Sequence, residues 1–119
     1  MNQDEMKQRT RQYSLQIIER CKELPKDYVA KRIGDQLLRA GTSVGANYRA
    51  ACRGRSTKEF VAKLGTVEEE ADETLYWIEL LAESKILPRD SLAGIWREGN
   101  EILSIIVTTI KTTRSKQGK

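Results

Sequence analysis

The sequence predicts an all-α protein of one domain, 1–119, folded as an up-down-up-down four-helix bundle. Apolar residues recur every three or four positions along four segments, which is the spacing of one face of an α-helix. No segment shows the sustained alternation of apolar and polar residues that is typical of a β-strand. Four amphipathic helices with short connections pack most simply as such a bundle. A longer fused coiled coil is the structural alternative, and the two prolines and a Gly54 loop argue against it.

The first two helices are expected at about residues 4–24 and 26–52. Leu24 should end the first helix, because a residue before proline disfavours the α region. Pro25 should then open the second helix, where its missing N–H costs nothing. The apolar stripes of the two helices consist of Met6, Thr10, Tyr13, Ile17, Cys21 and Leu24, and of Ile33, Leu37, Ala40, Val44, Tyr48 and Ala51.

The other two helices are expected at about residues 57–86 and 89–112, with Pro88 between them. Gly54 suits a left-handed position after the second helix. Ser56 and Glu59 have the spacing of a capping box at the start of the third. The polar end of the chain, 113–119, is expected to be flexible. The two stripes consist of Phe60, Leu64, Val67, Ala71, Thr74, Ile78 and Leu81, and of Leu92, Ile95, Gly99, Ile102, Ile106 and Ile110.

Cysteine usage and hydropathy predict a cytoplasmic protein. Cys21 and Cys52 are too few for a disulfide framework, and each lies on or beside an apolar face, which favours two reduced thiols. The first twelve residues are polar and charged, unlike the apolar core of a signal peptide. The longest apolar stretch, 102–110, is far shorter than the roughly 20 residues that span a bilayer.

Three segments resemble one known family. They are 36–47 (QLLRAGTSVGAN), 53–60 (RGRSTKEF) and 69–77 (EEADETLYW). They are similar to the signature of the four helix bundle protein family, also called the S23 or ribosomal-RNA intervening-sequence proteins, and the resemblance extends over about 13–111. Many members have Glu where this chain has Ala50, so a function that depends on that Glu would be missing here.

The resemblance implies a four-helix bundle, ring-like homo-oligomers that are typically pentamers, and no known enzymatic activity. Some members are encoded inside insertions in large-subunit ribosomal RNA genes. A more distant resemblance is to the accessory protein of diversity-generating retroelements, which binds nucleic acid and a reverse transcriptase. The expected partners are therefore other copies of the chain, RNA or DNA, and a nucleic-acid-processing protein.

The distribution of charge is uneven along the chain. The net charge is +4, but residues 1–63 hold 14 Lys/Arg and 7 Asp/Glu, whereas residues 64–119 hold 7 and 10. Cations lie on one sector of the second helix and in the loop after it, where they could bind backbone phosphate without reading sequence. The alternative is a solvated face, or ion pairs with the acidic third helix. The predicted nucleic-acid-binding residues are Arg32, Arg39, Arg49, Arg53, Arg55 and Lys58.

Two features predict contacts between subunits. Gly34, Gly41, Gly45 and Cys52 form a line beside the core stripe of the second helix, and glycine in a helix needs a compensating close approach by another helix. That helix could belong to the same chain or to another subunit, and the subunit contact is favoured. The third helix has a second apolar face, which could instead cover the edge of the fourth helix. The predicted interface residues are Gly41, Gly45, Tyr76, Trp77 and Leu80.

Catalysis, metal ions and cofactors are not expected. The chain has no histidine, which removes the Ser-His and Cys-His pairs of nucleophilic catalysis and the Glu-x-x-His pairs of di-metal bundles. The acidic residues Glu68, Asp72, Glu79 and Glu83 lie on a flank rather than in the core. The sequence therefore predicts a non-enzymatic oligomer that binds RNA or DNA. The alternative is a structural or adaptor protein whose charges serve only subunit and protein contacts.

Overall fold

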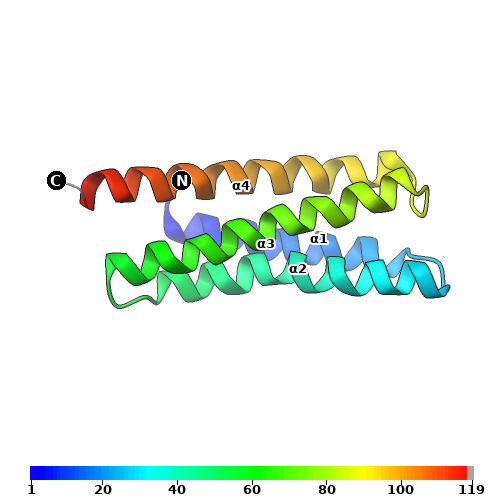
Figure 1. The fold of residues 1–119 in the computed structure, drawn as a ribbon, viewed down its shortest axis with the longest axis horizontal. Helices are drawn as coiled ribbons and strands as arrows, with labels where there is room; N and C mark the ends of the chain where they lie inside the picture. Colours follow the sequence, from blue (N-terminus) through cyan, green and yellow to red (C-terminus); the bar gives the residue numbers. More distant parts are fainter. Residues whose placement is uncertain (118–119) are drawn as a thin grey trace.

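The computed structural model describes residues 1–117, which form four α-helices and no strand (Figure 1). The helices are α1 (Gln3–Lys22), α2 (Tyr28–Cys52), α3 (Thr57–Glu83) and α4 (Arg89–Gln117). Consecutive helices pack against each other and α1 also packs on α4, whereas the backbones of the diagonal pairs α1–α3 and α2–α4 do not come close to each other. The molecule is a rod of 52 × 21 × 20 Å. These observations confirm the predicted all-α four-helix bundle.

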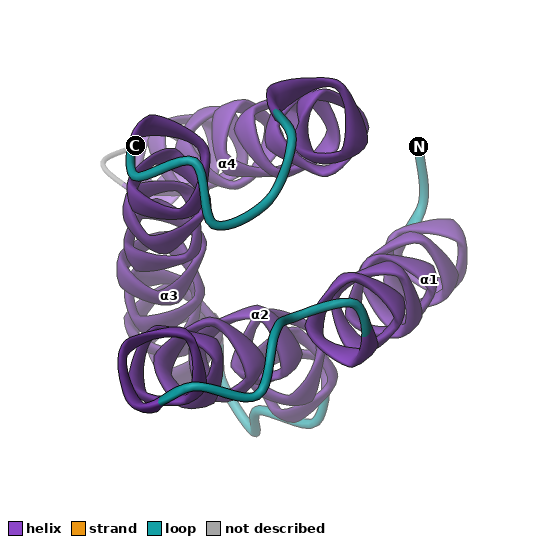
Figure 2. Cartoon of the chain, turned by 90° about the vertical axis from the view of Figure 1, so that its right-hand side faces the viewer, coloured by secondary structure: helices purple, strands orange, loops and turns teal. Residues whose placement is uncertain are grey.

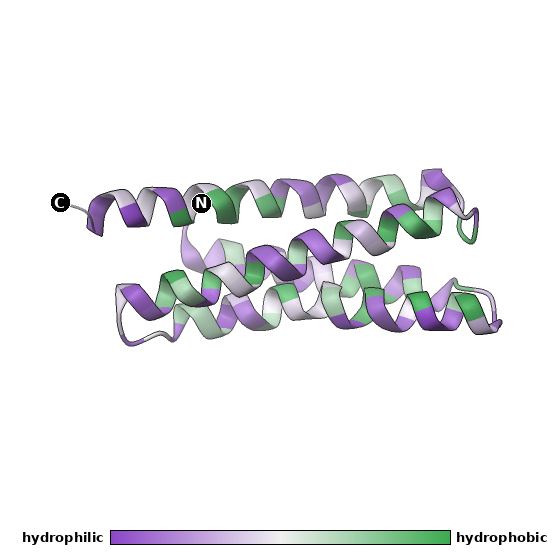
Figure 3. Cartoon of the chain, viewed as in Figure 1, coloured by the Kyte–Doolittle hydropathy of each residue, from purple (hydrophilic) through white to green (hydrophobic). Residues whose placement is uncertain are grey.

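The core lies along the axis of the rod and is formed by the predicted stripes. Each helix carries both hydrophobic and hydrophilic residues along its length, as amphipathic helices do (Figure 3). Six residues of these stripes are at most 1% exposed: Leu37, Val44, Leu64, Ile78, Ile102 and Ile106. The helical phasing read from the sequence is therefore correct.

The contact between α1 and α4 includes a polar bridge beside the apolar core. In the end-on view these two helices are farther apart than the other neighbours (Figure 2). Arg9 bridges them with two hydrogen bonds to Glu98, of 2.7 and 2.8 Å, and an ion pair of 2.9 Å to Glu101. The buried ring of Tyr13 lies against Gly99, where a Cβ atom would collide with the Tyr13 hydroxyl. Burial, with a smaller effect of the Glu98 charge, raises the pKa of Tyr13.

The start of α2 differs from the prediction. The helix begins at Tyr28 rather than at Pro25, because Asp27 is its N-cap. The Asp27 carboxylate accepts a hydrogen bond of 2.9 Å from the backbone N–H of Ala30. An aspartate at the N-cap accepts a hydrogen bond from one of the free backbone N–H groups at the helix start. A proline in the first turn makes no such bond; it only lacks an N–H of its own. The cap therefore sets the boundary.

The loop between α2 and α3 also differs in one respect. Gly54 does not have a positive φ, so the predicted left-handed conformation is wrong. Glycine is needed there for space, since a Cβ would lie 3.1 Å from the carbonyl oxygen of Ala51 and 3.2 Å from the Phe60 nitrogen. Ser56 caps α3 as predicted, and its hydroxyl accepts from the Glu59 N–H at 3.1 Å. The Glu59 carboxylate, however, accepts from the backbone N–H of Arg55, at 2.6 Å.

The C-terminal helix is longer than predicted. α4 continues to Gln117, so the residues from 113 to 117 are helical rather than a flexible tail. Residues 118 and 119 lie outside the described part of the chain. Lys and Arg near the helix end favour this extension, because cations stabilise the C-terminal end of a helix dipole. Within residues 1–117, none of the four helices has a stretch long and apolar enough to cross a bilayer.

Candidate nucleic-acid interface

Four cations gather where α2 ends and α3 begins. Arg49 lies in the last turn of α2, Arg53 caps that helix, Arg55 lies in the loop and Lys58 in the first turn of α3. All four side chains are exposed. None of them forms an ion pair with a carboxylate anywhere in residues 1–117. We call these four residues the loop site.

The backbone of the loop site is held in one conformation by its own hydrogen bonds. Glu59 bonds the backbone N–H of Arg55, and Ser56 bonds the N–H of Glu59. Gly54 permits the close approach of the chain to the end of α2. The positive end of the α3 dipole points toward the same loop, which favours an anion there. Hydrogen bonds therefore define the backbone of the loop that carries these cations.

The other two predicted nucleic-acid-binding residues lie elsewhere. Arg39 forms ion pairs with Glu70, at 3.2 Å, and with Glu73, both on α3. Arg32 lies over the ring of Tyr28 at the start of α2, with 5.1 Å between the guanidinium carbon and the ring centroid. A helix rises about 1.5 Å per residue, which places Arg32 about 30 Å from Arg53. The six residues therefore do not form one continuous surface.

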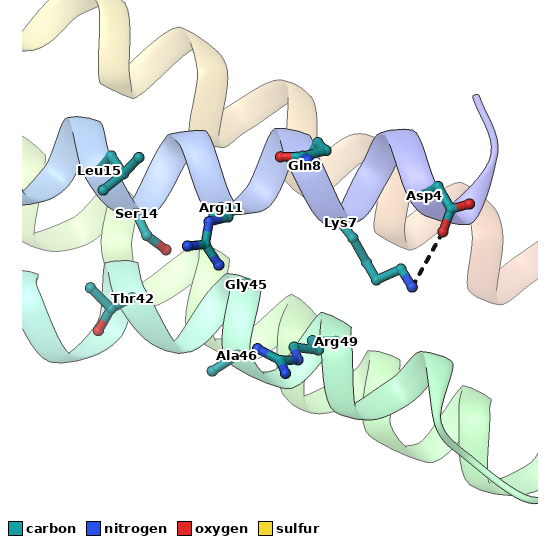
Figure 4. Close-up of a pocket in the computed structure, with 10 residues that line it drawn as sticks. All are labelled: Asp4, Lys7, Gln8, Arg11, Ser14, Leu15, Thr42, Gly45, Ala46 and Arg49. Atoms are coloured by element: carbon teal, nitrogen blue, oxygen red, sulfur yellow. Dashed lines mark ion pairs between the residues drawn. The ribbon is translucent and has the colours of Figure 1, made fainter.

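The sequence interpretation missed a contribution from α1. Arg11 and Lys7 of α1 face Arg49 of α2 across a groove of about 900 Å³, and Gly45 and Ala46 form part of its wall (Figure 4). Arg11 is exposed and has no ion pair in the described chain, whereas Lys7 pairs with Asp4 at 3.3 Å. The two cations are four residues apart, so they share one helix face. Their spacing in the sequence could have predicted a basic face on α1, but it could not show which helix lies opposite that face.

The glycine line of α2 faces α1 of the same chain. A Cβ on Gly41 would lie 2.8 Å from two side-chain carbons of Ile17, and one on Gly45 would lie 3.1 Å from the carbonyl oxygen of Thr10. Gly34 lies against Leu24 in the same way. The close approach that these glycines need is therefore provided inside the bundle. Gly41 and Gly45 contact α1 of the same chain, rather than another subunit as the sequence predicted.

The second apolar face of α3 is only partly exposed. Tyr76 is 54% exposed, whereas Trp77 and Leu80 are half-buried. Trp77 packs on the edge of the core and donates a hydrogen bond of 3.0 Å from its indole N–H to Glu73. Its ring meets that of Tyr76 edge to face, with centroids 5.1 Å apart. Since Glu73 also binds Arg39 of α2, Trp77 lies toward α2 rather than over the edge of α4.

Two observations concern metal binding and the reactivity of a thiol. No group of three or more His, Cys, Asp or Glu side chains in residues 1–117 is arranged to hold a metal ion. Burial, and to a smaller degree the charge of Asp35, raises the pKa of Cys21 to about 11. A thiol with that pKa is protonated at neutral pH and is a poor nucleophile.

Two acidic side chains of α3 accept hydrogen bonds from tryptophans: Glu73 from the indole N–H of Trp77, and Glu79 from that of Trp96.

Comparisons with known proteins identify the family and the fold. The family model described as 23S rRNA-intervening sequence protein matches residues 2–108. A crystal structure of a protein of unknown function from the S23 ribosomal protein family of Bacteroides thetaiotaomicron is 32% identical, with a TM-score of 0.84. That match covers 93% of this chain and 99% of the other. A search of curated proteins finds no match. The chain therefore belongs to the 23S rRNA-intervening sequence protein family.

Proposed function

We propose that this protein is a non-enzymatic oligomeric bundle of the cytoplasm that binds the backbone of RNA or DNA through the loop site. One observation supports the proposal above all. The side chains of Arg49, Arg53, Arg55 and Lys58 are exposed and form no ion pair in residues 1–117, whereas that of Arg39 on α2 is neutralised by α3. Cations without an internal partner are available to replace the counterions of a phosphate chain.

The chemistry of the loop site favours backbone contacts over base recognition. Arg and Lys bind phosphate oxygens in any sequence, and the free N–H groups at the start of α3 add a site for an anion. No aromatic side chain belongs to the loop site, so strong stacking of bases is not expected there. The family description names 23S rRNA, which makes RNA the first ligand to test.

Assembly would strengthen such a site. Single contacts with phosphate are weak, and a ring of identical subunits would present several loop sites to one nucleic acid. We propose a homopentamer, in keeping with the ring-like assemblies that the family resemblance implies. A nucleic-acid-processing protein is the further partner that fits this role.

The double substitution Arg53→Ala, Arg55→Ala is expected to weaken binding to RNA and to flatten its salt dependence. Each lost phosphate contact should reduce the slope of log K against log salt by about 0.7 for single strands and about 0.9 for a duplex. Fluorescence anisotropy at several salt concentrations measures both quantities. Arg97→Ala is the matched control, because Arg97 is exposed on α4 and has no ion pair in residues 1–117. Unmodified protein that binds no nucleic acid at low salt would refute the proposed function.

A second candidate function, that of a structural or adaptor protein, is supported by the aromatic face of α3. Tyr76 is a large side chain with 54% of its surface exposed, beside the half-buried Trp77 and Leu80. Tyrosine and tryptophan are enriched at the centres of protein interfaces. In this alternative the cations of the loop site would contact acidic protein surfaces instead of phosphate.

Tyr76→Lys is expected to break the oligomer and leave the helical circular dichroism unchanged. Position 76 is exposed and has Asp72 and Glu79 one turn away on either side, so a lysine there can pair within the helix. It is a cleaner probe than Trp77, which also packs on the core. Light scattering at micromolar concentration measures the subunit count, and Tyr28→Lys, at another exposed tyrosine, is the control. An unmodified protein that is a monomer would exclude the oligomer altogether.

A further inference from the structure

We propose that the groove between α1 and α2 is a track for a single strand of nucleic acid, continuous with the loop site. This inference rests on the proposed function, because the same strand would also contact the loop site. It adds the class of nucleic acid, single-stranded rather than duplex. It also adds two residues, Lys7 and Arg11, that the sequence did not assign to binding.

The cations around the groove form a continuous series. Lys7 and Arg11 are one turn apart on α1, which is about 6 Å along the helix axis. Arg49 faces them from α2 (Figure 4). Arg53 lies one turn beyond Arg49 and belongs to the loop site. Successive phosphates of one strand could therefore follow the groove and leave it at the loop.

The groove is open because its α2 wall has small side chains. Gly45 has no side chain, and Ala46 is exposed and ends at its Cβ. The backbones are close at this point, since a Cβ on Gly45 would lie 3.1 Å from the Thr10 carbonyl oxygen on α1. The two helices therefore form a shallow channel with Lys7, Arg11 and Arg49 along its sides and the Asp4–Lys7 ion pair on its α1 wall. Between Thr42 and Arg49, the α2 residues that line it are Gly45 and Ala46.

The dimensions and chemistry of the channel favour a single strand. Packed helices have axes about 8–10 Å apart, so a duplex could touch only the rims of the channel, whereas one strand can lie along it. Leu15 lies on the α1 side of the channel and is 48% exposed. It can contact the face of an unpaired base, and the guanidinium plane of Arg11 can stack on one. Base faces are accessible in this way only when the strand is unpaired.

An acidic helix of a second protein is the competing occupant. A helix in a groove is normally anchored by several apolar side chains one turn apart. The channel offers Leu15 as its one exposed large apolar residue, and its other walls are polar, charged or small. A phosphate strand needs positive charge along its path and few apolar contacts. The lining holds the three cations Lys7, Arg11 and Arg49 and one carboxylate, Asp4, which pairs with Lys7, so its net charge is positive and its unpaired cations are Arg11 and Arg49.

The sharpest test places a charge inside the channel. Ala46→Glu adds a carboxylate and Ala46→Gln adds a neutral side chain of the same shape, both at an exposed position where they are good helix formers. We expect Ala46→Glu to weaken binding of a fluorescein-labelled 15-nucleotide oligouridine about tenfold, and Ala46→Gln to change it less than about twofold. Duplex RNA of the same length should be affected less than about threefold, since it relies on the loop site. Arg11→Ala should weaken the single strand selectively, and Arg97→Ala is again the control.

Each other outcome has a defined meaning. If Ala46→Glu binds oligouridine like the unmodified protein while Arg53→Ala, Arg55→Ala binds it weakly, the channel is not used and the loop site stands. An equal loss for Ala46→Gln would attribute the effect to side-chain volume and would overturn the phosphate track. A changed subunit count for Ala46→Glu would make the channel a protein contact and overturn it as well. Circular dichroism and thermal midpoints, which should be unchanged, verify the fold of each variant.

Discussion

Replacing Leu64 with alanine is expected to lower the free energy of unfolding by about 2–5 kcal/mol. Leu64 is 0% exposed and lies in the core cluster with the stripes of the other helices. The truncation removes buried apolar surface and leaves a cavity that the rigid helices can only partly close. Single domains are stable by about 5–15 kcal/mol, so the loss is a large fraction of the total. Urea unfolding followed by far-UV circular dichroism measures it.

Leu38→Ala is the matched control for this experiment. The chemical change is the same, but Leu38 is 39% exposed on α2 and is outside the buried core. Its loss should therefore be much smaller than that of Leu64. Ile78→Ala, at a position that is 1% exposed, should behave like Leu64→Ala. If Leu64→Ala and Ile78→Ala both left the unfolding free energy unchanged, the core described here would be wrong.

The core could be predicted from the sequence because burial in a bundle depends on a single periodicity. A residue such as Ile102 faces the axis whichever helices lie beside it, as long as the apolar stripe is continuous. The same argument predicted Leu37 and Val44 correctly. Four stripes separated by short connections leave few other arrangements, so the fold class followed from the pattern.

Helix boundaries were less predictable because local signals compete. Pro25 and Asp27 can both begin a helix, and the carboxylate that satisfies an N–H determined the start of α2. Gly54 suggested a left-handed residue, yet the left-handed conformation near a helix end occurs at Lys85, with a φ of 62°. Gly54 is required by the approach of Ala51 and Phe60, which only the folded loop reveals.

The candidate site could be predicted only in part, because it depends on which helices are neighbours. The positive charge of α2 was visible in the sequence, but the pairing of Arg39 with Glu70 and Glu73 follows from the packing of α3 on α2. In the same way, Arg11 became part of a groove only because α1 lies antiparallel to α2. The sequence of one helix shows which residues are charged. Whether a charged side chain has an ion-pair partner depends on the neighbouring helix and is seen only in the packed bundle.

The glycine line allows a direct test of the packing of α1 on α2. Gly41→Ala is expected to lower the free energy of unfolding, because the new Cβ would lie 2.8 Å from both Cγ1 and Cγ2 of the buried Ile17. Overpacking of this kind costs about 1–3 kcal/mol, which exceeds the gain of up to about 1 kcal/mol from removing a helical glycine. Gly65→Ala is the control, since a Cβ there meets no atom within 4 Å and only the gain remains.

A double-mutant cycle with Ile17 identifies the contact itself. Ile17→Ala removes both Cγ atoms, so Gly41→Ala should cost much less in that background than in the unmodified protein. Urea unfolding of the four proteins gives the coupling free energy between the two positions, and contacting residues typically show about 0.5–3 kcal/mol. If Gly41→Ala stabilised the protein as much as Gly65→Ala, α1 would not pack tightly on α2. The compensation for the helical glycines would then have to come from another subunit, as the sequence first suggested.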